Sequence, residues 1–130
     1  MNRLVLDASV IAQWFQEGKG PDWRRAEDLR EQMKAAEIAV SSPGILRLEL
    51  VNVAGRQWKW SGEALLELVE TIEDWNIRFD EPSLFDVARW TAKGLSAYDS
   101  SYVALAETLD VPLITNDRSI LAKARHIATR

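Results

Sequence analysis

Short apolar segments alternate with longer stretches of helical periodicity along the chain, and this order constrains the fold more than any single motif. The apolar segments have the length of buried strands and lie at residues 3–6, 38–40, 77–79 and 112–115. Strands that are separated by helices pair in parallel, and the helices then cover both faces of the sheet. We therefore predict a single domain over residues 1–130, of the α/β class, with a short and mainly parallel sheet.

Helices are predicted between and after these segments from apolar spacing, capping residues and boundary glycines or prolines. They cover residues 10–15, 23–36, 44–60, 61–75, 81–93, 99–109 and 118–125. Asp22 and Ser42 are the predicted caps of the second and third helices, and Asp99 is predicted to begin the sixth. No repeat, low-complexity tract or linker interrupts this succession, which agrees with a single domain.

The composition excludes several classes of protein. The sequence contains no cysteine, so it can form neither a disulfide framework nor a thiolate metal site, and we expect a cytoplasmic location. The first apolar run is too short for a signal peptide, and no stretch is long enough to span a membrane. The net charge of −4 argues against nucleic-acid binding through a general basic surface, although a cation held among carboxylates would change the local field.

Four carboxylates lie where neither a strand nor a helix requires them. Asp7 directly follows the first predicted strand, and Asp117 follows the last. Asp99 is in the first turn of the helix that leads into the last strand, and Glu49 interrupts the apolar face of its helix. Because reactive clefts in parallel sheets lie beyond the carboxyl ends of the strands, Asp7 and Asp117 are predicted to share one edge.

Each of these residues also has a purely structural interpretation. Asp7, Asp99 and Asp117 could cap the helices that follow them, and Glu49 could extend to solvent. Together, however, they would repel one another, since two charges about 4 Å apart cost roughly 4 kcal/mol at an effective dielectric constant of about 20. A folded chain tolerates such a group when some members are protonated or a cation lies between them.

The ligand chemistry of such a site favours magnesium or manganese. All four candidates are oxygen ligands, the chain has no cysteine, and its single histidine, His126, lies near the C-terminus and is expected on the surface. Hard oxygen ligands select Mg²⁺ or Mn²⁺ rather than zinc. These ions suit phosphodiester hydrolysis, because they activate water and offset charge on the phosphate.

Three motifs carry a resemblance to a known family. LDAS at residues 6–9, LELVN at 48–52 and YDSSYVALAETLDVPLITND at 98–117 resemble, in order and spacing, the PIN domain and more narrowly the VapC-type toxins of prokaryotic toxin–antitoxin pairs. The resemblance implies a three-layer α/β/α sandwich and a metal-dependent endoribonuclease. The family's four acidic residues correspond to Asp7, Glu49, Asp99 and Asp117, which would bind Mg²⁺ or Mn²⁺ and carry catalysis.

The same resemblance implies supporting roles for nearby polar residues. They are Ser9, Asn52, Thr115 and Asn116, which would orient ligands, waters or a phosphate. Glu49 could either bind the metal or accept a proton from the attacking water, and the sequence does not separate these roles. Arg56 lies seven residues after Glu49, on the same face of the predicted helix, and is a candidate RNA contact; a solvated arginine is an equally good interpretation.

The resemblance also implies partners, namely an RNA substrate, a cognate antitoxin protein and a second copy of the chain in a homodimer. One alternative is a PIN-like binding module without catalysis. Another is a small phosphotransfer domain, which is disfavoured because Asp7 is followed by Ala8 and Ser9 without the expected second acid and lysine motif. The four acids alone do not distinguish RNA from DNA as substrate.

Overall fold

The computed structural model describes residues 2–130 and contains a five-stranded sheet. The strands are β1 (Asn2–Leu6), β2 (Ile38–Ser42), β3 (Ile77–Phe79), β4 (Leu113–Ile114) and β5 (Ala128–Thr129). Their order across the sheet is β3-β2-β1-β4-β5, and every neighbouring pair is parallel. The predicted parallel sheet is therefore confirmed, with β1 in its centre.

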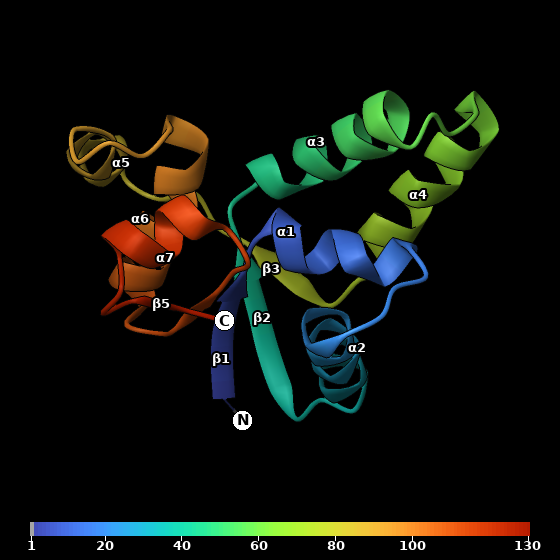
Figure 1. The fold of residues 1–130 in the computed structure, drawn as a ribbon, viewed down its shortest axis with the longest axis horizontal. Coiled ribbons are helices and arrows are strands. Elements are labelled where there is room, and N and C mark those ends of the chain that lie inside the picture. Colours follow the sequence, from blue (N-terminus) through green and yellow to red (C-terminus); the bar gives the residue numbers. More distant parts are fainter. Residues whose placement is uncertain (1) are drawn as a thin grey trace.

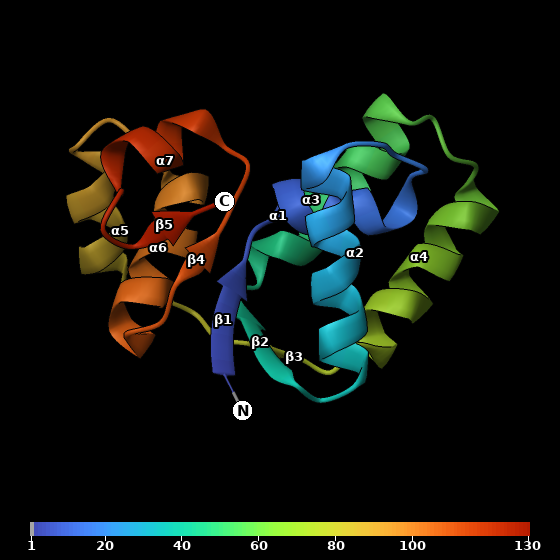
Figure 2. The same ribbon diagram turned by 60° about the horizontal axis from the view of Figure 1, so that its bottom comes forward.

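Helices cover both sides of the sheet. They are α1 (Ala8–Ile11), the 3₁₀ helix η1 (Ala12–Phe15), α2 (Pro21–Lys34), α3 (Ile45–Asn52), the π-helical turn η2 (Val53–Gln57), α4 (Gly62–Asp74), α5 (Leu84–Thr91), α6 (Ala97–Leu109) and α7 (Arg118–Lys123). Figures 1 and 2 show α1 to α4 on one side of the strands and α5, α6 and α7 on the other. The expected three-layer α/β/α arrangement is confirmed.

The centre of the molecule is formed by strands that are apolar on both faces and by one enclosed helix. Val5 and Leu6 of β1 and Leu113 of β4 have no exposed surface, as expected for strands covered on both sides. Helix α6 is buried at every position from 100 to 106. Its amino end, which carries Asp99, therefore has a fixed position relative to the sheet.

Tryptophan and phenylalanine side chains fill the space between η1 and α4. Trp14 packs edge to face on Trp75 with ring centroids 5.4 Å apart, and its indole N–H donates to the Ala26 carbonyl at 2.8 Å. The ring centroids of Trp58 and Trp60 lie 5.3 Å apart in the same region. These tryptophan side chains thus serve packing.

Two of the predicted helix caps are wrong. Helix α2 begins at Pro21 after Gly20, whose φ of 93° suits a residue without a side chain, and Asp22 lies in the first turn instead. Ser42 is the last residue of β2, and its hydroxyl donates to the Leu6 carbonyl at 2.7 Å. This hydrogen bond links β2 to β1. The residue that precedes α3 is Gly44.

The start of α6 also differs from the prediction. Ser96 is its cap and accepts from the Asp99 backbone N–H at 3.0 Å, so Asp99 lies inside the first turn. The carboxylate of Asp99 is consequently free of the capping role that was its structural alternative. Most other boundaries agree with the predictions within about two residues, the usual uncertainty of helix ends.

The predicted helix over residues 44–60 changes character halfway. It is α-helical to Asn52, continues as a π turn over Val53–Gln57 and ends before Trp58. Strand β5 was not predicted, because a two-residue strand has no periodicity to detect. No helix within residues 2–130 has the length and apolar character needed to cross a bilayer.

Candidate active site

Asp7 lies at the junction between β1 and α1 and is almost completely buried. It caps α1 by accepting a hydrogen bond from the Ser9 N–H at 3.0 Å. The Ser9 hydroxyl donates to one of its carboxylate oxygens, and the Thr115 hydroxyl donates to the other. Burial nevertheless raises the pKa of Asp7 to about 6, and these hydrogen bonds only partly oppose that rise.

The junction after β4 is fastened to the junction after β1 by the same hydroxyl groups. The Asn116 N–H donates to the Ser9 hydroxyl at 3.0 Å, and the Asp117 N–H donates to the Thr115 hydroxyl at 3.0 Å. Both hydroxyls donate to Asp7; Ser9 accepts from the junction after β4, and Thr115 accepts from Asp117 in its own junction. This arrangement fixes the position of Asp117 relative to Asp7.

Asp117 caps α7, because its carboxylate accepts from the Ile120 N–H at 2.9 Å. Capping, which was the structural alternative for Asp7 and Asp117, is thus real for both residues. It does not exclude a second role, since each carboxylate oxygen has more than one acceptor position.

Asp99 and Asp117 are close enough to influence each other. Asp99 is partly buried, and burial followed by the negative charge of Asp117 raises the pKa of Asp99 above its usual value. The N-terminal turn of α6 therefore directs a carboxylate toward the edge of the sheet where β4 ends.

Glu49 completes the group from the other helical layer. It is partly buried on α3, and its carboxylate accepts a hydrogen bond of 2.6 Å from the Tyr102 hydroxyl. Burial raises its pKa most, and the negative charges of Asp7 and Asp99 raise it further. Solvent exposure, which was the structural alternative for Glu49, therefore does not describe its environment.

Together these influences connect all four predicted acids. The negative charges of Asp7 and Asp99 raise the pKa of Glu49, and the negative charge of Asp117 raises the pKa of Asp99. The four side chains come from different segments that meet where β1 and β4 end. The structure thus brings together an acidic group whose negative charge is incompletely compensated by the protein.

The four carboxylates suit a hard cation that keeps part of its water shell. Within residues 2–130, no three carboxylate or histidine side chains converge closely enough to enclose a metal ion. Mg²⁺ is usually bound through one or two carboxylates and several waters, so a closed protein cage is not required. The all-oxygen chemistry and the raised pKa values of Asp7, Glu49 and Asp99 agree with such a cation.

An open pocket of about 580 Å³ adjoins this group. It is lined by Glu49 and Asn52 together with Ile45, Leu48, Val51 and Tyr98. Asn52 is exposed and one turn after Glu49, so its amide can reach a bound molecule there.

Arg56 has a different position from the one the spacing predicts. The expectation that it shares a face with Glu49 assumed a continuous α-helix, and this assumption is wrong because residues 53–57 form a π turn. A π turn holds more residues than an α turn, which rotates Arg56 away from its expected direction. Arg56 is exposed, and its contact with RNA stays a prediction.

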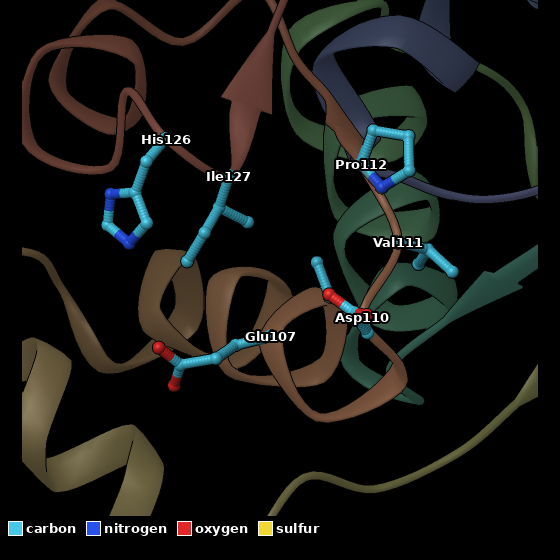
Figure 3. A pocket seen from close by; sticks show the side chains of 7 residues that line it. Glu107, Asp110, Val111, Pro112, His126 and Ile127 are labelled. Atoms are coloured by element: carbon cyan, nitrogen blue, oxygen red, sulfur yellow. The ribbon is translucent and has the colours of Figure 1, made fainter.

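A second pocket, of about 360 Å³, lies at the amino ends of β4 and β5, opposite to the end of the strands that carries the acidic group. Figure 3 shows its lining, which is Ala106, Glu107, Asp110, Val111, Pro112, His126 and Ile127. These residues precede β4 and β5, whereas the acidic group follows β1 and β4. None of the predicted site residues lines this pocket. His126 is exposed, as expected, and stacks on Trp90 at 6.0 Å between ring centroids.

Sequence reasoning missed one residue of the site, Tyr102. Its side chain is 1% exposed and looks like a core aromatic in the sequence. One signal was present, because Tyr102 follows Asp99 by three residues and shares its helix face.

Comparison with known proteins agrees with the motifs. A family model described as the PIN domain matches residues 4–126. Ribonuclease VapC3 from Pyrobaculum aerophilum is 30% identical, over 98% of both proteins. FitAcB from Neisseria gonorrhoeae has a similar structure, with a TM-score of 0.67 and 18% identity, covering 98% of this chain and 96% of that one. PAE2754 from Pyrobaculum aerophilum gives a TM-score of 0.64 and 22% identity, covering 94% and 84%.

The two solved structures support the fold, while the family model and the VapC relative identify the family. The resemblance to PIN domains and to VapC proteins is confirmed, and this chain belongs to the PIN domain family.

Proposed function

We propose that the chain, as one catalytic domain, is a divalent-metal-dependent endoribonuclease and the toxin of a toxin–antitoxin pair. The observation that carries this proposal is the acidic group where β1 and β4 end, in which three carboxyl groups have raised pKa values. A relative named as a ribonuclease, at 30% identity over nearly the whole chain, supports RNA as the substrate.

Asp7, Asp99 and Asp117 would hold Mg²⁺ or Mn²⁺, directly or through waters, and Glu49 lies beside them. When bound, such an ion lowers the pKa of a coordinated water and offsets charge on the scissile phosphate. The protein supplies the orientation of the ligands. The Ser9 and Thr115 hydroxyls hold the two oxygens of Asp7, so this carboxylate cannot rotate freely.

Glu49 has two roles consistent with its environment. It can be a fourth ligand, or it can accept the proton of the attacking water. A general base works best when its pKa lies near the working pH, and the pKa of Glu49 is raised in that direction. Asn52, one turn later on the same helix, would contact the phosphate or an adjacent nucleotide from the open pocket.

We also propose protein partners, namely a cognate antitoxin and a second copy of the chain. Leu84 and Phe85 at the start of α5 are 81% and 90% exposed, and Leu48 and Tyr98 near the acidic group are 67% and 62% exposed. Large apolar side chains exposed in this number support an interaction surface. Light scattering of the purified protein, alone and with the antitoxin, tests both partnerships.

The test of catalysis is cleavage of total cellular RNA by the antitoxin-free protein. Mg²⁺ or Mn²⁺ should produce discrete fragments, and EDTA or Asp99→Asn should abolish them. Asp110→Asn is the matched control, because it makes the same change at the far end of α6, where the backbone has a left-handed conformation that asparagine also adopts. This control should cleave like the parent.

Intact RNA under every condition, from folded protein that is free of partner, would favour the alternative of a binding module without catalysis. Single-stranded and double-stranded DNA should be included as substrates, since the acidic group does not select RNA by itself. Cleavage of DNA in preference to RNA would overturn the choice of substrate and leave the metal-dependent hydrolysis in place.

A further inference from the structure

The side chain of Tyr102 lies between the elements that carry the acidic group. It comes from the enclosed helix α6, three residues after Asp99, and is 1% exposed. Its hydroxyl donates to Glu49 on α3 at 2.6 Å. One hydroxyl group thus connects the helix of Glu49 with the helix of Asp99.

The environment of Glu49 makes this hydrogen bond important. Its carboxylate is partly buried and close to two other negative charges, Asp7 and Asp99. Electrostatic repulsion favours a rotation of the side chain toward the adjoining open pocket, which Glu49 also lines. The Tyr102 hydroxyl is the donor that opposes this rotation.

The Tyr102 phenol keeps its proton at neutral pH, because even an unperturbed tyrosine has a pKa of about 10. Burial, and then the negative charge of Glu49, raise the pKa of Tyr102 above its usual value. Hydrogen bonds to charged groups are also shorter and stronger than neutral ones, which agrees with the 2.6 Å distance.

We propose that Tyr102 is a positioning residue, whose hydroxyl holds the Glu49 carboxylate toward Asp7 and Asp99, so that Glu49 contacts a cation bound there directly or through a water. The proposal rests on the proposed function, because it assigns Tyr102 a role in the same metal site. It concerns the hydroxyl alone, since the aromatic ring would fill the same space in phenylalanine.

The test measures Mn²⁺ binding by calorimetry, without any RNA. Tyr102→Phe should weaken Mn²⁺ binding about 10-fold or more, the usual effect of removing a group that orients a ligand. Glu49→Gln should also weaken binding, and adding Tyr102→Phe to it should cause no further loss, because the hydroxyl acts through Glu49. Thr71→Val is the control, because it also removes a hydroxyl group, but on α4, where that hydroxyl donates to the Glu67 carbonyl. This control should bind Mn²⁺ like the parent.

Mn²⁺ binding by Tyr102→Phe within about 2-fold of the parent would overturn the proposal, and so would fully additive losses in the double variant. Absence of Mn²⁺ binding by the parent would overturn it as well. If the parent cleaves RNA and Tyr102→Phe binds Mn²⁺ normally, only this inference fails. If binding depends on Tyr102 but the parent cleaves no RNA, the inference stands and the ribonuclease proposal fails.

A second measurement avoids the substitution of Tyr102, in case that variant does not fold. Parent protein labelled with 3-fluorotyrosine contains two fluorinated residues and should give two ¹⁹F resonances. The resonance assigned to buried Tyr102 should shift in Glu49→Gln and on addition of Mg²⁺ to the parent. A Tyr102 resonance unaffected by both changes would overturn the proposal.

Discussion

Replacing Asp7 by asparagine should stabilise the metal-free protein at neutral pH, although it removes a candidate metal ligand. The Asp7 side chain is 4% exposed, and its pKa is raised from 3.8 to about 6, mainly by burial. The ionised carboxylate is therefore less stable in the folded chain than in the unfolded chain. A difference of about two pKa units corresponds to about 3 kcal/mol of unfolding free energy at pH 7.5.

The substitution also removes favourable interactions. Asparagine caps helices about as well as aspartate, but its amide cannot accept hydrogen bonds at both positions from the Ser9 and Thr115 hydroxyls. This loss is worth about 1 kcal/mol, which leaves a net gain of about 2 kcal/mol. In a chain of this size, such a gain raises the melting temperature by roughly 8 °C.

The effect should depend on pH in a defined direction. Because the pKa of Asp7 is higher in the folded state, stability from its protonation is fully present below about pH 4 and is lost as pH rises through about 6. The advantage of Asp7→Asn should therefore shrink as pH falls from 7.5 toward 4. Urea unfolding in EDTA at several pH values measures this change.

Two comparisons make the result decisive. Asp28→Asn, at an exposed position of α2, should change stability by less than about 0.5 kcal/mol. Asp99→Asn should stabilise the metal-free protein in the same direction as Asp7→Asn, because its pKa is also raised. If both Asp7→Asn and Asp99→Asn unfold at lower urea than the parent at pH 7.5, the argument from crowded carboxylates is refuted.

Thr115→Val removes the hydroxyl that donates to Asp7 and accepts from the Asp117 N–H. It should lower the unfolding free energy by about 1–3 kcal/mol, measured by urea titration, and an unchanged urea midpoint would contradict this. Mn²⁺ at about 100 times its Kd should stabilise the parent by about 2.7 kcal/mol, and equal protection of Asp99→Asn in a melting assay would argue against Asp99 as a ligand. Phe85→Ser, at a side chain that is 90% exposed, should change monomer stability by less than about 0.5 kcal/mol but reduce self-association in light scattering.

The strands in the centre of the sheet could be predicted because they are apolar on both faces. Val5 and Leu6 illustrate this pattern, since neither has exposed surface. Strand β5 gives no such signal, because its two residues, Ala128 and Thr129, pair only with β4 at the edge. Its pairing depends on where α7 places the chain, which is a tertiary effect.

Helix starts were harder to predict than helices. Ser96 and Asp99 are both good capping residues, and they are three positions apart, the spacing of a cap and the residue it bonds. The local sequence does not decide which one begins the helix. The π turn after Asn52 was equally hidden, since residues 53–57 have no unusual composition that marks it.

The acids of the site could be singled out because they lie at junctions or interrupt an apolar face. The hydrogen bond between Tyr102 and Glu49 could not, because it joins side chains 53 positions apart. Only the tertiary structure, in which α6 packs on β1, brings these two side chains together. Ser9 and Thr115 are intermediate cases, since the motifs indicate their importance but not the two junctions that their hydroxyls join.

The order of the strands has a consequence for the time at which the acidic group forms during protein synthesis. β1 is made before the other strands, but one of its two neighbours in the sheet, β4, is made only after β2 and β3. Asp99 and Asp117 are also the last two acids of the group to be translated. Because domains are synthesised from the N-terminus, the nascent chain carries an incomplete acidic group until β4 docks beside β1. Synthesis itself therefore keeps the acidic group incomplete until β4 and Asp117 have been translated.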